Sequence, residues 1–233
     1  MEDRAKAKIT PKREKGPTMR AMILMLAALV AVAVVPLPAP AQTMEFKLLP
    51  RYSVATFKSD APLETFLGHS SDVAGGIQGS LSVDPARPEG GKATVRVDMT
   101  LVRTGIEKRD ADMRGKPYLE TDVEANRWVT FHVTKVEVTG PLEPGKTIPA
   151  KIHGLLTVKN KPVEKVADAT LTYIKLTPEQ VEAQKRFGFT SDNIKVRAKT
   201  TTTFTDHGMQ VPQILIFKVA NEIQIETDLV FVK

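Results

Sequence analysis

The stretch Ala93-Thr94-Val95-Arg96-Val97-Asp98-Met99-Thr100-Leu101 alternates apolar and polar residues without a break. Such alternation is typical of a β-strand with one buried and one solvated face, because successive side chains point to opposite sides. We therefore expect residues 93–101 to form a strand of a sheet that covers a core on one side only.

Similar patterns extend over the rest of the chain beyond residue 50. Further strands are expected at 53–57, 77–83, 129–138, 151–159, 167–173, 194–198, 213–219 and 223–231. In 129–138 the apolar positions change parity, which a β-bulge near Thr134 or Lys135 would explain. Turn residues separate the strands and no β-α-β alternation is present, so the pattern predicts an all-β fold. We expect an antiparallel sheet that either closes into a barrel or folds into a sandwich.

Two short helical segments are expected between the strands. Thr177-Pro178-Glu179-Gln180 has the residues of an N-cap, a proline at the first helical position and a capping box. With Gly188 as the C′ residue, this pattern predicts a helix over 178–187. A second helical turn is expected over 61–67, between Asp60 and Gly68.

The first 41 residues have the pattern of a secretory signal peptide. Basic residues precede an unbroken apolar run from Ala21 to Val35, and Ala39-Pro40-Ala41 ends the segment with small residues at the positions that a signal peptidase recognises. We expect cleavage after Ala41 and a periplasmic or secreted protein. Met1 and Met19 are alternative starts, and with Met19 residues 1–18 would be a non-native extension.

The charge and the absence of cysteine restrict what the mature chain can be. Segment 1–41 holds seven basic and three acidic residues, so its removal lowers the formal charge from +6 to +2. This value is too small to indicate a nucleic-acid-binding protein. Without cysteine the exported chain has no disulfides and no site for a lipid anchor. Residues 42–233 are expected to form one domain that its core alone stabilises.

The sequence contains no recognisable catalytic, cofactor or metal motif. The four histidines (His69, His132, His153 and His207) have no metal-ligand spacing, and HExxH, GxSxG and P-loop patterns are absent. We therefore expect no enzyme, no cofactor and no metal. Two basic groups remain, and both are compatible with solvated surfaces or with anion binding: Lys195, Arg197 and Lys199 on one strand face, and Arg103, Lys108, Arg109, Arg114 and Lys116 in a loop.

Several of these segments resemble the YceI family when they are taken in order. That family has a TG…RD-x-x-[LM]-[RK] segment followed by a strand that opens on x-x-F. In this chain Thr104-Gly105 and residues 109–114 resemble the segment, and residues 129–131 resemble the start of the strand. Residues 152–163 resemble its L-x-G-x-L-T strand and turn, and 57–81 resemble its amino-terminal glycine pattern. Asn126-Arg127, where the family often has Tyr-Pro, and Asn160, where it often has glycine, depart from the pattern.

The resemblance implies an extended, lipocalin-like antiparallel β-barrel of about eight strands whose lumen holds an isoprenoid chain. Small residues at inward positions (Ala93, Ala150, Gly154, Ala167, Ala169 and Ala198) would leave room in such a lumen. A self-filled barrel or a close-packed sandwich would also use them. The expected lumen residues are Val95, Val97, Met99, Leu101, Phe131, Leu171, Tyr173, Ile223 and Ile225. Arg109 and Arg114 are the expected headgroup contacts, although both could be outer partners of Asp110 and Asp112.

The resulting hypothesis is an exported protein that holds a polyisoprenoid or another long-chain lipid, of the quinone or polyprenyl phosphate type. The alternative is a periplasmic stress-related interaction protein with a filled barrel and no lipid. A third hypothesis is an enzyme that acts on a lipid headgroup, but no activated nucleophile supports it. A transient contact with a membrane surface and a homodimer are both compatible with the leading hypothesis.

Overall fold

The computed structural model describes residues 42–70, 75–214 and 217–233, so the expected signal peptide lies outside the described residues. The strands are β1 (Met44–Leu48), β2 (Val54–Ala61), β3 (Glu64–His69), β4 (Ile77–Val83), β5 (Lys92–Asp98), β6 (Trp128–Val138), β7 (Thr147–Val158), β8 (Lys161–Lys175), β9 (Asp192–Thr203), β10 (Gln213–Ile214), β11 (Phe217–Lys218) and β12 (Glu222–Val232). The helices are α2 (Glu107–Arg114) and α3 (Pro178–Gln184), with 3-10 turns η1 (Pro50–Tyr52), η2 (Pro88–Gly90), η3 (Glu124–Asn126), η4 (Lys185–Phe187) and η5 (Thr205–His207).

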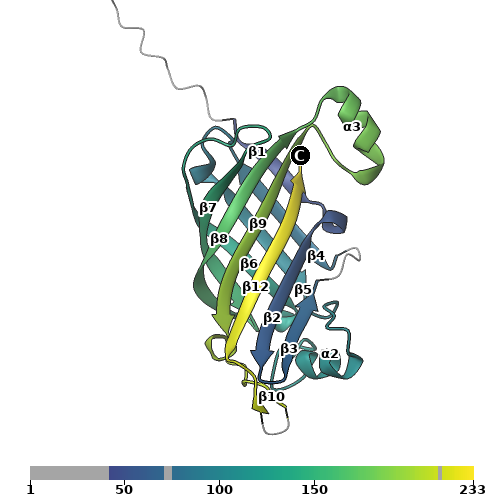
Figure 1. Cartoon of the computed structure of the whole chain (residues 1–233), viewed down its shortest axis with the longest axis vertical. Helices are drawn as coiled ribbons and strands as arrows, with labels where there is room; N and C mark the ends of the chain where they lie inside the picture. Colours follow the sequence, from purple (N-terminus) through teal and green to yellow (C-terminus); the bar gives the residue numbers. More distant parts are fainter. Residues whose placement is uncertain (1–41, 71–74, 215–216) are drawn as a thin grey trace, which may run out of the picture. The chain divides into compact units, whose positions relative to one another are not determined.

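The main sheet closes into a barrel. Its strands follow the order β1-β4-β5-β6-β7-β8-β9-β12, and β1 also pairs with β12 through Lys47↔Val232 and Leu48↔Phe231 (Figure 1). Every pairing between these strands is antiparallel. The expected antiparallel barrel of about eight strands is therefore confirmed. Strand β1, which sequence patterning did not predict, supplies the closure.

Strands β2 and β3 form a hairpin, and β2 pairs with the same edge of β12 as β1 does. After the η1 turn, β2 pairs with the first half of β12, from Gln224↔Lys58 to Asp228↔Val54. The helical turn expected over 61–67 is wrong, because this segment forms the tip of the hairpin and most of β3. Gly68 lies opposite Phe57, whose ring lies where a Gly68 side chain would be. The glycine therefore belongs to a cross-strand pair and does not end a helix.

The two ends of the barrel differ, and we name them by the short elements beside them. The α2 end contains α2, the tip of the β2–β3 hairpin and the β10–β11 hairpin, and the η2 end contains η2 and α3 (Figure 1). Helix α2 falls in a segment that we expected to be a loop. It is polar apart from Ala111 and Met113, and its Asp110 carboxylate accepts hydrogen bonds from Thr104 N (2.8 Å) and Oγ1 (2.6 Å). Because it has no apolar stripe, hydrophobic periodicity does not reveal it.

The bulge in β6 and the helical segment over 178–187 are present, whereas two expected strands have different bounds. The register between β6 and β7 shifts between Val133 and Lys135, which confirms the expected bulge. The capping box at Thr177 and a positive φ of 86° at Gly188 confirm the helical segment over 178–187. The strand expected over 93–101 ends earlier, at Asp98. The segment expected at 213–219 forms β10 and β11, and 215–216 lie outside the described residues.

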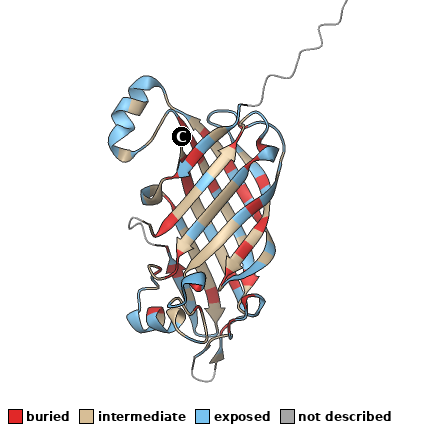
Figure 2. Ribbon diagram, turned by 180° about the vertical axis from the view of Figure 1, so that it is seen from behind, coloured by how far each residue is buried: buried red, intermediate tan, exposed pale blue. Residues whose placement is uncertain are grey.

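Exposed side chains cover the outer face of the barrel, and apolar ones point inward. Buried and exposed residues alternate along the strands (Figure 2). The basic side chains of β9 lie on the outer face in ion pairs with β12: Lys195 and Arg197 with Asp228 (3.1 and 3.0 Å), and Lys199 with Glu226 (2.9 Å). These basic side chains are therefore paired with carboxylates on the outer face, which agrees with the prediction of a solvated surface.

Gly154 on β7 leaves space that Phe131 fills. A Cβ atom at this position would lie 2.5 Å from the His132 carbonyl oxygen and 2.6 Å from the Phe131 ring. Because the oxygen belongs to the backbone, Gly154→Ala should lower the free energy of unfolding by about 2 kcal/mol, as overpacking does. Urea denaturation measures this loss. Gly90→Ala is the matched control, since a Cβ there meets nothing within 4 Å, and equal stability of the two variants would contradict the close contact.

Candidate ligand-binding cavity

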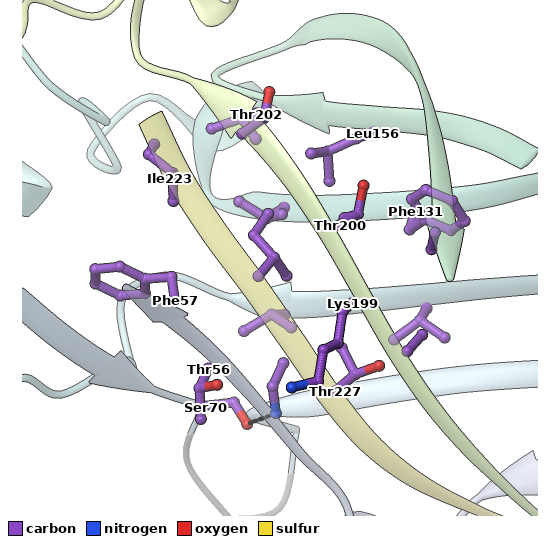
Figure 3. A pocket seen from close by; sticks show the side chains of 18 of the residues that line it. Thr56, Phe57, Ser70, Phe131, Leu156, Lys199, Thr200, Thr202, Ile223 and Thr227 are labelled. Carbon is purple, nitrogen blue, oxygen red and sulfur yellow. Dashed lines mark hydrogen bonds between the residues drawn. The ribbon is translucent and has the colours of Figure 1, made fainter. Parts of the chain in front are cut away.

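A cavity of about 710 Å³ runs through the barrel, which lies within the range of about 300–1,000 Å³ for ligand pockets. Every strand of the closed barrel except β1 contributes side chains to its wall, and so do β2, β3 and the segment around α2. Figure 3 shows Phe57, Phe131, Leu156 and Ile223 among the residues that line it. Apart from a few threonines and serines, the wall between the two ends of the barrel is formed by carbon atoms.

The cavity is closed at the η2 end and opens at the α2 end. At the η2 end the lining residues Val83, Pro88, Gly91 and Leu142 are buried, the exposed Lys92 has outward parity on β5, and Leu142 N donates to Pro85 O (2.7 Å). At the α2 end the lining residues include exposed and charged ones: Glu64, Ile106, Lys108, Asp112 and Gln213. An elongated apolar molecule would therefore enter tail first and leave its polar end at α2.

Most of the lumen residues expected from the sequence lie on the cavity wall. They come from strands on different sides of the barrel and from the turn after β5: Val95, Val97, Met99, Phe131, Leu171, Ile223 and Ile225. Of the small inward residues, Ala93, Ala167 and Ala198 also line the cavity. The contact of these side chains with a lipid stays a prediction.

Leu101 and Tyr173 do not line the cavity. Leu101 falls in the turn after β5, where its N–H donates to the Asp98 carbonyl (3.1 Å). Tyr173 has the inward parity of Leu171, but it lies near the end of β8 and its hydroxyl donates to the buried Asp192 carboxylate. Burial, together with this carboxylate, raises the pKa of Tyr173 to about 12. The alternation of apolar and polar residues therefore predicts which face of a strand points inward, but not where along the strand the cavity wall ends.

Several wall residues were not named from the sequence. The strands contribute Phe57, Leu156, Val158, Val196, Leu229 and Phe231, and the segments at the α2 end contribute Met113, Tyr118, Leu119, Phe204 and Met209. Leu229 and Phe231 share the parity of Ile223 and Ile225, so the same alternation could have identified them. The second group lies outside the strands, where no periodic signal exists.

The two expected headgroup arginines have different positions. Arg109 lines the open end, and its guanidinium donates to Thr104 and Glu64 and lies 5.1 Å from the centre of the Phe66 ring. Arg114 does not line the cavity, and its guanidinium donates to the Met99 and Val102 carbonyls (3.4 and 2.7 Å). Both side chains therefore connect α2 to neighbouring segments.

A buried carboxylate holds the segment that leads from β5 to the open end. Asp98 is 2% exposed, and its Oδ1 accepts from Thr100 N (3.0 Å) and Oγ1 (2.6 Å). Its Oδ2 accepts from Arg127 Nε (3.0 Å) and Nη2 (2.7 Å). Burial alone would raise the pKa of the Asp98 carboxyl, but these hydrogen bonds lower it below its usual value. The carboxylate is therefore charged in the folded protein.

A fully buried histidine fixes the turn after β9 beside the open end. His207 Nδ1 lies 3.0 Å from the Lys161 carbonyl oxygen, which can only accept, so Nδ1 carries the proton. Nε2 then accepts from Thr202 Oγ1 (2.8 Å), and Thr202 itself lines the cavity. Burial lowers the pKa of His207 although the Lys161 carbonyl and Asp206 oppose this, so the ring is neutral at pH 7.

This lowered pKa predicts a pH dependence of stability. Because the unfolded chain takes up a proton near pH 6.5 while the folded His207 resists it, the free energy of unfolding should fall as the pH drops below about 6.5. Denaturation with urea at pH 7.5 and 5.5 measures the difference. His207→Gln, which can form the same two hydrogen bonds, should remove it, whereas His132→Gln on the outer face should retain it. An unchanged difference in His207→Gln would contradict the assignment.

Within residues 42–70, 75–214 and 217–233, no three His, Cys, Asp or Glu side chains form a group that could hold a metal ion. No helix in those same ranges is long and apolar enough to cross a membrane.

Comparison with known proteins places this barrel among solved structures. The crystal structure of Burkholderia cenocepacia BcnA is similar with a TM-score of 0.57 and 16% identity, over 78% of this chain and 98% of that one. A polyisoprenoid binding domain from Saccharophagus degradans, implicated in plant cell wall breakdown, gives a TM-score of 0.54 and 16% identity, over 80% and 97%. At such identities these similarities establish the fold alone. No curated protein matches the sequence.

The sequence itself matches a family description over nearly the whole barrel. The family model for the YceI-like domain matches residues 46–231, which include every strand except the first two residues of β1 and the last residue of β12. The closed barrel, the lumen and this match agree with the resemblance noted in the sequence. The chain belongs to the YceI-like domain family.

Proposed function

We propose that this chain is an exported binding protein that holds one long apolar lipid of the polyisoprenoid class inside its barrel. The observation that carries the proposal is the cavity of about 710 Å³, apolar along its length, closed at the η2 end and open at the α2 end. A wall of carbon binds an isoprenoid tail through the hydrophobic effect, at about 25 cal/mol for each Å² buried. Binding, and not catalysis, is the proposed activity.

The family membership and one structural neighbour support this proposal. The Saccharophagus degradans structure is a polyisoprenoid binding domain, and the present chain shares its fold. The alternative, an interaction protein with a filled barrel, predicts a lumen that its own side chains occupy. A cavity of about 710 Å³ favours the lipid-binding proposal over that alternative. A homodimer and a contact with a membrane surface stay predictions.

Direct binding measurements test the proposal. Delipidated protein is titrated with polyprenols of increasing chain length, and native mass spectrometry counts the bound molecules. We expect one long polyprenol for each chain, with affinity that rises with chain length because more apolar area is buried. Absence of binding at every length would contradict the proposal.

Export is proposed from the sequence of residues 1–41, and its test is independent of lipid binding. We expect the mature protein in a bacterial host to begin at Gln42, after cleavage behind Ala41. Intact-mass measurement of the protein from the periplasmic fraction checks this. A full-length chain retained in the cytoplasm would contradict export and leave the lipid-binding proposal in place.

A further inference from the structure

The charged side chains at the open end of the cavity are balanced. We define the rim as the lining residues of this end that surround α2: Glu64, Thr104, Ile106, Lys108, Arg109 and Asp112. It contains two cations and two carboxylates, so its formal charge is zero. The polar end of a ligand bound tail first would lie among these four charges.

Three of the five N–H groups of Arg109 are used by contacts within the protein. Nε donates to Thr104 Oγ1 (2.9 Å), Nη2 donates to Thr104 O (2.9 Å), and Nη1 donates to Glu64 Oε1. The side chain is 20% exposed and lies against the Phe66 ring. A phosphate is recognised best by a free, bidentate guanidinium fork. Here Thr104 occupies the Nε side of the guanidinium, and a phosphate could reach only the remaining N–H groups of Nη1 and Nη2, beside the Glu64 carboxylate.

Lys108 has a carboxylate partner of its own on the same helix. Its Nζ lies 3.1 Å from Asp112 Oδ2 and 3.3 Å from Oδ1. Both side chains are exposed, at 84% and 58%, so the pair alone is weak. A dianionic headgroup that approached Lys108 would nevertheless meet the Asp112 carboxylate at the same time.

The other cations near the described wall are directed elsewhere. Arg114 donates to two backbone carbonyls, as described above. Lys92 and Lys199 are among the lining residues, but Lys199 is paired with Glu226, and Lys92 has the outward parity of Thr94 and Arg96 on β5. Tyr118, an uncharged residue with a hydroxyl group, also lines the cavity. An uncharged polar group therefore fits this end better than an anion.

We infer that the ligand of this barrel carries an uncharged oxygen-containing headgroup, such as a quinone or an alcohol, and not a phosphate or diphosphate. The inference rests on the proposed function and narrows its ligand class. A neutral headgroup can occupy the rim without breaking the Arg109–Glu64 and Lys108–Asp112 pairs. A diphosphate would have to break one of them or remain beside two carboxylates.

The test compares three ligands of equal chain length: a polyprenol, an isoprenoid quinone and a polyprenyl diphosphate. We expect the delipidated protein to bind the alcohol or the quinone at least about tenfold more tightly than the diphosphate, a difference of about 1.4 kcal/mol. Comparison of the alcohol with the quinone distinguishes the two neutral headgroups. Equal or tighter binding of the diphosphate would overturn the inference while supporting the proposed function. Failure of all three to bind would overturn both.

A charge variant tests the role of the rim itself. Glu64→Gln with Asp112→Asn removes both rim carboxylates and should raise the ratio of diphosphate to polyprenol affinity by about tenfold. Asp168→Asn with Glu137→Gln makes the same change in charge on the outer face, where these carboxylates pair with Lys151 and Lys135. This control should leave the ratio within about twofold of the original value. An equal rise in both variants would overturn the assignment to the rim.

Discussion

Val97→Trp should abolish lipid binding and leave the barrel folded. Val97 lines the cavity on β5 and packs against both buried clusters, the one that contains Phe46 and Phe231 and the one that contains Met99 and Leu156. An indole at this point fills space that an isoprenoid chain would need. We expect the dissociation constant for a long polyprenol to rise at least about 100-fold, or about 2.8 kcal/mol.

The stability of the same variant distinguishes an open lumen from a packed core. In an open cavity the indole has room, so the midpoint of thermal unfolding should change by only a few degrees. In a filled barrel it would overpack the core and unfold the protein. Thr170→Trp, which adds the same side chain on the outer face of β8, is the matched control and should bind lipid normally. Unfolding of Val97→Trp, or unchanged binding, would contradict a ligand in this cavity.

Asp98→Ala should cause the largest loss of stability among substitutions near the open end. It removes the acceptor of four hydrogen bonds, two from Arg127 and two from Thr100, and leaves Arg127 with only Glu124 and the Trp128 ring beside it. Breaking a buried pair typically costs about 3–5 kcal/mol, and because Arg127 is 40% exposed we expect about 3 kcal/mol. The turn after Asp98 carries Met99 and Val102, so lipid affinity should fall as well.

Denaturation with urea measures this effect and also gives its pH dependence. Because the folded pKa of Asp98 lies below its unfolded value near 3.9, its contribution is present at neutral pH and is lost as the pH falls below about 4. Asp98→Ala should therefore flatten the stability profile in acid. Asp168→Ala removes an exposed carboxylate that pairs with Lys151, and it should cost less than about 1 kcal/mol. Similar losses in the two variants would contradict a structural role for Asp98.

The sequence predicts the barrel because most of its strands are long and have one wet face. The alternation in β5, β8, β9 and β12 identifies their inward residues, and the change of parity in β6 locates its bulge. Strand β1 alternates too, with Phe46 and Leu48 buried and Lys47 exposed, but five residues directly after a predicted cleavage site give a weak signal. In the β2–β3 hairpin, Asp60 and Gly68 resemble the ends of a helix. Only the Phe57 ring, which lies opposite on β2, explains why residue 68 is a glycine.

The open end of the cavity was less predictable than its walls. Helix α2 has only Ala111 and Met113 as apolar residues, and polar contacts connect its Asp110 and Arg109 to Thr104 and Glu64. Glu64 is 45 residues away from Arg109 in the sequence, so no local pattern shows that the arginine is already paired. The sequence therefore placed Arg109 in the loop that lines the open end of the cavity, but the charge balance of the rim required the structure.

Extraction of the native ligand tests the central claim most directly. The protein is purified without detergent from the periplasm of a bacterial host, extracted with organic solvent and analysed by mass spectrometry, with Val97→Trp prepared in parallel. We expect about one long-chain isoprenoid per chain from the original protein and none from the variant. Repeated extraction of no lipid, or of the same lipid from both proteins, would contradict a polyisoprenoid held in the barrel.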